Sequence, residues 1–156
     1  MDLSDLLSPA AVIPALKSQS KKQVIQELSE RAARLSGLSQ REIFDTILQR
    51  ERLGSTGVGS GVAIPHGKLR SIDRLMGVFA RLARPVDFDA VDDLPVDLAF
   101  LLLAPEGAGA DHLKALARIA RVLRNQGVAQ QLRATDDAEA LYALLVSPLP
   151  TSHAAA

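Results

Sequence analysis

One histidine in this sequence lies beside a run of glycines, and that combination suits phosphate chemistry. The run is Gly54-Ser55-Thr56-Gly57-Val58-Gly59-Ser60-Gly61, and it leads into Ile64-Pro65-His66-Gly67-Lys68. Glycine lacks a Cβ atom, so such a backbone can approach an anion closely and donate its N–H groups to phosphate oxygens. Histidine is a nucleophile near neutral pH and can form a covalent intermediate. The local chemistry therefore suggests a phosphoryl group carried on His66.

Two other phosphate-binding motifs and a metal site fit this segment poorly. A Walker A loop ends in Gly-Lys-Ser or Gly-Lys-Thr, whereas Gly59 is followed by Ser60 and Gly61. A dinucleotide-binding fingerprint requires a third glycine at the position of Val62. A zinc site needs three or four ligands. Two histidines with Asp111 are the best set available, without any His-x-x-x-His spacing, and we expect no metal.

Capping residues and hydrophobic spacing predict two helices before the glycine run. One is expected over residues 20–37 and the other over residues 39–54. Each begins with a serine that is followed three residues later by Gln or Glu, as in a capping box. Arg50 falls in the last turn of the second helix, beside the glycines. Short apolar segments predict a proline-bounded edge strand and three further strands, at residues 10–13, 62–64, 76–82 and 96–104.

Two further helices are expected in the second half of the chain. One begins at Asp111 and ends at Asn125-Gln126-Gly127, and the other runs from Asp136 to Val146. The apolar spacing of the first predicts that its buried face consists of Leu113, Leu116, Ala117, Ala120 and Leu123. Alternating strands and helices favour an α/β layered fold. We expect one domain over residues 1–147, followed by a flexible tail over residues 148–156.

The composition narrows the class of protein. The chain has 156 residues, of which 47% are apolar and few are aromatic, so we expect one domain with an aliphatic core. Its 18 basic and 18 acidic side chains cancel, which argues against nucleic-acid binding by bulk electrostatics. The absence of cysteine excludes disulfides and thiolate metal sites. The N-terminus is acidic and no apolar run is long enough for a bilayer, so we expect a cytoplasmic protein without membrane insertion.

These motifs resemble the enzyme IIA proteins of the bacterial phosphotransferase system, fructose/mannitol type. The resemblance extends from Leu3 to about Val146 and looks strongest toward the stand-alone, nitrogen-related branch. It implies a three-layer α/β/α sandwich around a mixed β-sheet, with the active histidine at the end of a strand. Besides the glycine run and the segment around His66, it rests on Arg50-Glu51-Arg52-Leu53, Phe88-Asp89-Ala90 and Asp111-His112-Leu113.

The resemblance also implies roles for single residues. His66 is expected to carry the phosphoryl group on its ε nitrogen while its other ring nitrogen bonds a neighbouring acceptor. Arg50 is expected to compensate the phosphate charge with its guanidinium fork, and Arg52 is the competing candidate. His112 would orient His66 or hydrogen-bond the phosphate, unless it faces solvent at a helix start. His153, near the C-terminus, receives no role.

Further phosphate contacts are expected from the flanks of His66. Ser55 and Thr56 would either donate hydroxyl hydrogen bonds to phosphate oxygens or cap turns. Gly57 and Gly67 would offer backbone N–H groups to the phosphate. Lys68 would contact the phosphate or the donor protein, or stand exposed without a role.

The function implied by the resemblance is that of a phosphoryl carrier. His66 would accept phosphate from an HPr-like phosphohistidine protein (NPr), without a nucleotide or other cofactor, and the phosphorylation state would regulate partner proteins. The alternative is a sugar-specific enzyme IIA that passes phosphate to a separate IIB protein for sugar uptake. We expect neither a IIB nor a membrane IIC domain within 156 residues, which favours regulation.

Overall fold

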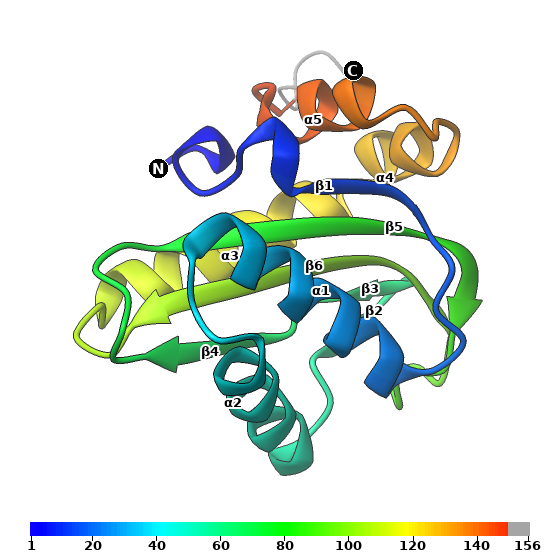
Figure 1. Cartoon of the computed structure of the whole chain (residues 1–156). Helices are drawn as coiled ribbons and strands as arrows, with labels where there is room; N and C mark the ends of the chain where they lie inside the picture. Colours follow the sequence, from blue (N-terminus) through cyan, green and yellow to red (C-terminus); the bar gives the residue numbers. More distant parts are fainter. Residues whose placement is uncertain (150–156) are drawn as a thin grey trace.

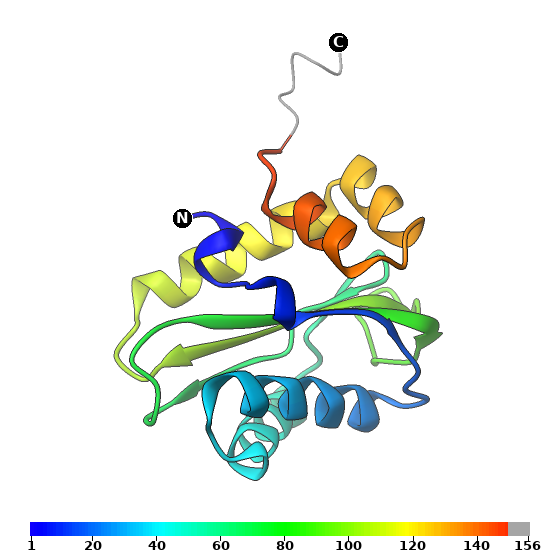
Figure 2. The same cartoon turned by 45° about the horizontal axis from the view of Figure 1, so that its top comes forward.

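A mixed β-sheet lies between two layers of helices in the computed structural model, which describes residues 1–149 (Figure 1). Helices α1 (Lys21–Ser36) and α2 (Gln40–Leu53) cover one face of the sheet. Helices α3 (Ala110–Arg124), α4 (Gln126–Arg133) and α5 (Ala138–Val146) cover the other, as Figure 2 shows. The three-layer α/β/α arrangement is therefore confirmed. Most of the tail predicted over residues 148–156 lies outside the described residues.

Six strands form the sheet, in the order β1-β5-β6-β3-β2, and β4 also pairs with β6. Strands β5 and β6 are antiparallel, whereas β3 and β4 both run parallel to β6 and β1 runs parallel to β5. The sheet is thus mixed, as expected, with β6 at its centre. The strands are β1 (Val12–Leu16), β2 (Gly57–Gly59), β3 (Val62–Ala63), β4 (His66–Leu69), β5 (Met76–Val86) and β6 (Val96–Pro105).

Strands β3 and β4 lie end to end along one side of β6. Val62 pairs with Leu98 of β6, and His66 pairs with Leu102. Pro65 stands between them, and its carbonyl oxygen accepts a hydrogen bond from the Leu102 N–H at 2.9 Å. Proline has no N–H with which to continue the ladder. The sequence predicted one strand running into His66, whereas the structure shows that His66 opens a separate strand.

The glycine run forms a β-hairpin rather than an open loop. Strands β2 and β3 pair in antiparallel fashion. Gly59, which ends β2, and the connecting residues Ser60 and Gly61 have φ angles of 99°, 58° and 79°. This left-handed region favours glycine, so these two glycines are explained by the turn. Strand β2 escaped prediction because glycine is depleted in strands.

The caps predicted for the first two helices are confirmed. The Ser20 hydroxyl accepts a hydrogen bond from the Gln23 N–H at 3.2 Å, and the Ser39 hydroxyl accepts one from the Glu42 N–H at 3.3 Å. Helix α2 ends where expected, with Arg50 in its last turn. At the N-terminus, two 3-10 helices, η1 (Leu3–Asp5) and η2 (Pro9–Ala11), precede the edge strand β1, which therefore starts later than predicted.

The buried face of α3 agrees with the prediction only in part. Leu123 is buried, and Leu116 and Ala120 are partly buried against the core. Leu113 and Ala117 are exposed. Positions 112, 115, 119 and 122 recur at helical spacing and point toward the sheet. The prediction followed the leucines and treated His112 as polar, which rotated the helix by one position. The buried residues of α3 are His112, Ala115, Ile119, Val122 and Leu123.

The end of α3 is also the start of a helix that was not predicted. The Asn125 side chain accepts a hydrogen bond from the Val128 N–H at 3.0 Å and so caps α4. Helix α5 begins one residue later than expected, because Asp137 rather than Asp136 accepts from the Ala140 N–H, at 3.0 Å.

The core is more aromatic than the composition suggested. Phe79, Phe88 and Phe100 are all fully buried beside the expected aliphatic residues. Within residues 1–149, no helix combines the length and apolarity that a bilayer span requires.

Candidate functional site

His66 is half-buried at the break between β3 and β4. Its Nδ1 lies 2.7 Å from the carbonyl oxygen of Ile64. A carbonyl oxygen can only accept a hydrogen bond, so in the neutral ring Nδ1 carries the proton and Nε2 keeps its lone pair. Ile64 is thus an acceptor of the kind expected for the second ring nitrogen. The arrangement presents Nε2 as the nucleophilic atom of His66.

His112 lies directly beside His66, although 46 positions separate them in the sequence. The two ring centroids are 5.6 Å apart, with the rings inclined at 71°. His112 is only 7% exposed, and its Nε2 is buried without a hydrogen-bond partner in the described part of the chain. The alternative of a solvent-facing histidine is therefore wrong. A buried imidazole nitrogen without a partner is available to a group that the protein itself does not supply.

Both histidines favour the neutral form. Burial lowers the pKa of His66, a hydrogen bond to the backbone opposes that change, and the Arg50 charge lowers the pKa further while Glu51 raises it. Burial likewise lowers the pKa of His112, with smaller effects from His66 and the Lys68 charge. A neutral His66 ring keeps the Nε2 lone pair free for attack on phosphorus.

Arg50 reaches the site from the last turn of α2. Its Nη1 donates a hydrogen bond to the carbonyl oxygen of Gly54 at 2.8 Å. A guanidinium carries five N–H groups, so four remain for another acceptor. Arg52 is exposed, and it is not among the charges that shift the pKa of His66. The charge of Arg50, and not that of Arg52, therefore affects the pKa of His66, and the contact of Arg50 with phosphate stays a prediction.

Glu51 received no role from the sequence, yet it holds the turn that follows α2. Its side chain is 1% exposed, and the Nζ of Lys21 lies 2.8 Å from its Oε2. The carboxylate accepts hydrogen bonds from the Thr56 N–H, with distances of 3.3 and 3.2 Å to its two oxygens, and another from the Thr56 hydroxyl. A buried carboxylate that accepts this many hydrogen bonds holds the surrounding groups rigidly.

Lys21 and Ser55 tie the same turn to the segment around Phe88. The Lys21 ammonium lies 3.4 Å from the Phe88 carbonyl oxygen and 5.2 Å from the centre of the Phe88 ring. The Ser55 hydroxyl donates to the same carbonyl oxygen at 2.5 Å and accepts from the Gly57 N–H at 3.0 Å. The hydroxyls of Ser55 and Thr56 thus both donate to protein acceptors in the free protein. Their predicted bonds to phosphate stay a prediction.

Gly57 and Gly67 are buried where a side chain would not fit. A Cβ at Gly57 would lie 2.8 Å from the Cβ of a neighbouring alanine, and one at Gly67 would lie 2.8 Å from Cγ2 of Thr46. Close packing therefore explains both glycines, and their contact with phosphate stays a prediction. Lys68 is exposed on the same face of β4 as His66, because alternate residues of a strand share a face.

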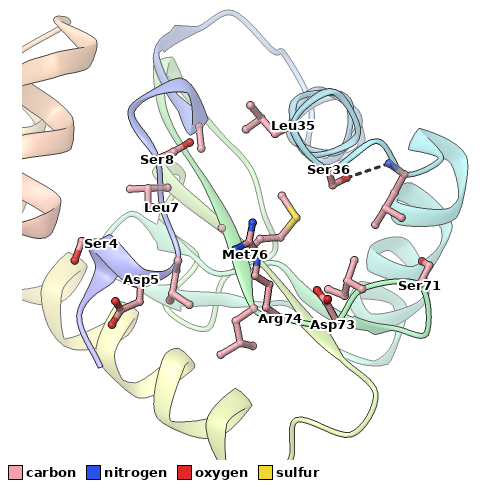
Figure 3. A pocket seen from close by; sticks show the side chains of 16 residues that line it. Ser4, Asp5, Leu7, Ser8, Leu35, Ser36, Ser71, Asp73, Arg74 and Met76 are labelled. Carbon is pink, nitrogen blue, oxygen red and sulfur yellow. Dashed lines mark hydrogen bonds between the residues drawn. The ribbon is translucent and has the colours of Figure 1, made fainter.

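A hollow of about 420 Å³ elsewhere in the molecule is separate from this site (Figure 3). It is lined by the N-terminal segment, the end of α1 and residues 71–77. Figure 3 shows that the Ser36 hydroxyl in the wall of the hollow already has a partner within the protein: it accepts a hydrogen bond from the Leu38 N–H at 3.2 Å. No residue that the sequence assigned to phosphate lines this hollow.

Comparisons with known proteins place this chain among relatives of similar sequence and fold. Residues 5–147 match the family described as "Phosphoenolpyruvate-dependent sugar phosphotransferase system, EIIA 2". The chain is 59% identical to a nitrogen regulatory protein of Bradyrhizobium diazoefficiens, over 97% of this chain and 99% of that protein. It is 40% identical to the nitrogen regulatory protein of Escherichia coli, over 93% and 90% of the two chains. The crystal structure of nitrogen regulatory protein IIA-Ntr from Neisseria meningitidis matches with a TM-score of 0.87 and 36% identity, over 92% of this chain and 98% of that one.

Proposed function

Because this chain belongs to the EIIA type 2 family of the phosphoenolpyruvate-dependent sugar phosphotransferase system, we propose that it carries a phosphoryl group on Nε2 of His66. The observation that supports this choice of atom is the 2.7 Å contact between Nδ1 and the Ile64 carbonyl oxygen. It assigns the proton to one ring nitrogen and leaves the other with a lone pair directed away from the backbone. The donor is an HPr-like phosphohistidine protein.

The transfer needs no cofactor. The donor phosphohistidine ring carries a proton on its other nitrogen, so when its P–N bond breaks the imidazole keeps the electron pair and departs as a neutral ring. A new P–N bond forms to Nε2 of His66, which keeps its Nδ1 proton and so takes up the positive charge. The transition state spreads negative charge over three phosphoryl oxygens. Arg50 still has four N–H groups to offer, and the buried Nε2 of His112 donates when it carries the proton. These two side chains stabilise that charge.

Three exposed apolar side chains belong to segments that adjoin residues of the site and suit a protein donor. Leu53 is 85% exposed and precedes the Gly54 turn, and Leu113 is 69% exposed and follows His112. Val91 is 79% exposed, and its N–H bonds to the Gly57 carbonyl oxygen at 3.3 Å. Exposed apolar groups around a polar centre are typical of protein interfaces. We assign Leu53, Val91 and Leu113 to the docking rim for the phosphoryl donor.

The nitrogen-related branch fits this chain better than a sugar-specific one. The 59% match, to a nitrogen regulatory protein, spans nearly the full length of both chains. In this role the phosphorylation state of His66 regulates partner proteins. Adding close to two negative charges beside Lys68, on a strand anchored in the sheet, alters the surface potential without a change of fold.

The proposal is tested by incubating the protein with phosphoenolpyruvate, enzyme I and an HPr-type carrier, followed by intact mass measurement. We expect one added phosphoryl group, which is lost in acid and retained in alkali. His66→Ala should abolish the gain in mass. Full labelling of His66→Ala, with none in His112→Ala, would contradict the assignment.

The docking rim is tested separately in the same assay. Leu53→Ser and Leu113→Ser should raise the donor concentration needed for half-maximal rate while leaving the rate at saturation unchanged. Leu35→Ser is the matched control, because Leu35 is an exposed leucine at the opposite end of α1 from Lys21. Equal effects of all three variants would refute the rim.

A further inference from the structure

We propose that the Lys21–Glu51 ion pair positions His66 for phosphoryl transfer, by holding the backbone that fixes the reactive form of its ring. Neither side chain touches the imidazole in the structure, so both are positioning residues rather than catalytic ones. The inference rests on the proposed role of His66 as the phosphoryl carrier.

Three consecutive contacts lead from the ion pair to the imidazole. The Glu51 carboxylate accepts from the Thr56 N–H and hydroxyl. The Thr56 carbonyl oxygen accepts from the Ile64 N–H at 3.0 Å, and the Ile64 carbonyl oxygen lies 2.7 Å from Nδ1 of His66. Ile64, whose carbonyl oxygen selects the tautomer of His66, is therefore held in place through Thr56. If Thr56 shifts, the Ile64 carbonyl shifts with it and the tautomer is no longer fixed.

Arg50 and Glu51 are neighbours that hold the same turn from different sides. Arg50 bonds the Gly54 carbonyl oxygen through an exposed contact, whereas the contacts of Glu51 to Thr56 are buried. The outer contact uses one of the five N–H groups of the guanidinium and leaves four for an incoming phosphate. The buried contact holds the turn independently of Arg50.

Lys21 compensates the negative charge of the Glu51 carboxylate near the site. A lone negative charge would oppose the arrival of a phosphoryl group that carries nearly two. The Lys21 ammonium, 2.8 Å from the carboxylate and 20% exposed, neutralises that charge. Its second acidic neighbour, Asp89, is 3.9 Å away and 80% exposed, so it contributes little. The pair provides rigid hydrogen bonding without adding net charge to the site.

The direct test is the ¹⁵N NMR spectrum of the histidine rings in the unphosphorylated protein. The wild type should show His66 as a single Nδ1–H tautomer at pH 8. Lys21→Met and Glu51→Gln should move the Nε2 and Nδ1 shifts toward each other, as expected for a mixture of tautomers. The same variants should slow phosphorylation by about 10- to 100-fold, the loss typical of a misplaced reacting group. Lys21→Arg, which keeps the charge, should restore both readouts.

The matched control is a second partly buried ion pair, between Arg133 of α4 and Asp97 of β6, with 2.8 Å between its closest atoms. Asp97→Asn should lower the melting temperature without changing the His66 tautomer or the rate. Lys21→Met keeps an unbranched side chain of similar length and is the variant expected to fold if Glu51→Gln does not.

Each outcome separates this inference from the proposed function. Folded Lys21→Met protein with the wild-type tautomer and a rate within twofold of wild type would overturn the inference while leaving the carrier function intact. If His66 proved not to carry phosphate, the tautomer measurement on the free protein would still decide whether the ion pair positions the ring. If Asp97→Asn changed the His66 tautomer and the phosphorylation rate as much as Lys21→Met does, the Lys21–Glu51 pair would act only on overall stability. That result would also overturn the inference.

Discussion

Replacing Arg50 by alanine should slow phosphorylation of His66 by about 10- to 150-fold. Arg50 has committed one N–H to the Gly54 carbonyl at 2.8 Å, which leaves four for a phosphoryl oxygen. A hydrogen bond to a charged acceptor contributes about 1.5–3 kcal/mol, and each 1.36 kcal/mol corresponds to a tenfold change in rate. The bond to Gly54 is present both in the free protein and in the transition state, so losing it raises the free energy of both states equally. The expected change in rate therefore comes from the loss of one hydrogen bond to the phosphoryl group.

Arg50→Ala can also change the phosphorylation rate through the protonation state of His66, so the pH of the assay must remove that effect. The Arg50 charge helps to lower the pKa of His66, so Arg50→Ala should raise that pKa. At pH 8 the ring is neutral in both proteins, and the remaining difference in rate reports contact with the phosphoryl group. The assay is the initial rate of mass gain with phosphoenolpyruvate, enzyme I and an HPr-type carrier at pH 8.

The control for Arg50→Ala is Arg52→Ala. Arg52 is an exposed arginine in the same last turn of α2, so its removal changes the net charge equally. It should alter the rate by less than about twofold. A rate within twofold of wild type for Arg50→Ala, or an equal loss for both variants, would refute the reasoning.

Three further predictions concern other parts of the site and its support. His112→Ala should slow phosphorylation about tenfold, because a donor beside the phosphate is lost, while the mass gain stays at one phosphoryl group. A second phosphoryl group on the wild-type protein would contradict this supporting role of His112. Burial lowers the pKa of His66 and His112, so the unfolded chain binds their protons more readily. Urea unfolding should therefore show stability falling as the pH drops below about 6.5 toward the folded pKa values, and less so in the His66→Gln/His112→Gln protein. Gly67→Ala should lower the free energy of unfolding by about 1–3 kcal/mol, because its Cβ meets Thr46, whereas Gly107→Ala, with nothing within 4 Å, should change it by less than about 0.5 kcal/mol.

Local signals predicted the parts of the fold that local chemistry determines. The serine caps at Ser20 and Ser39 and the buried run of β6 lie where the sequence indicated. The hairpin of β2 and β3 was not predicted, because a glycine-rich segment has almost no side chains whose periodicity marks a strand. Its pairing is determined by contact with β6, more than thirty residues away in the sequence.

The candidate site shows the same division. Motif resemblance directed attention to His66, Arg50 and His112. The structure brings the two histidine rings together, and the Arg50 charge acts on the pKa of His66. Glu51 and Lys21 were missed, because an ion pair between two helices leaves no spacing in the sequence. One signal was available: an acidic residue in the last turn of a helix and a lysine in the first turn both oppose the helix dipole. Such misplaced charges indicate a tertiary partner.

The measurement that tests the central claim most directly is the ¹⁵N NMR spectrum of histidine-labelled protein after phosphorylation. A phosphoryl group changes the shift and adds a phosphorus coupling at the ring nitrogen that bears it. We predict that the coupling appears at Nε2 of His66, while Nδ1 keeps its proton and its bond to the Ile64 carbonyl oxygen. Coupling at Nδ1 of His66, or at either nitrogen of His112, would contradict the account.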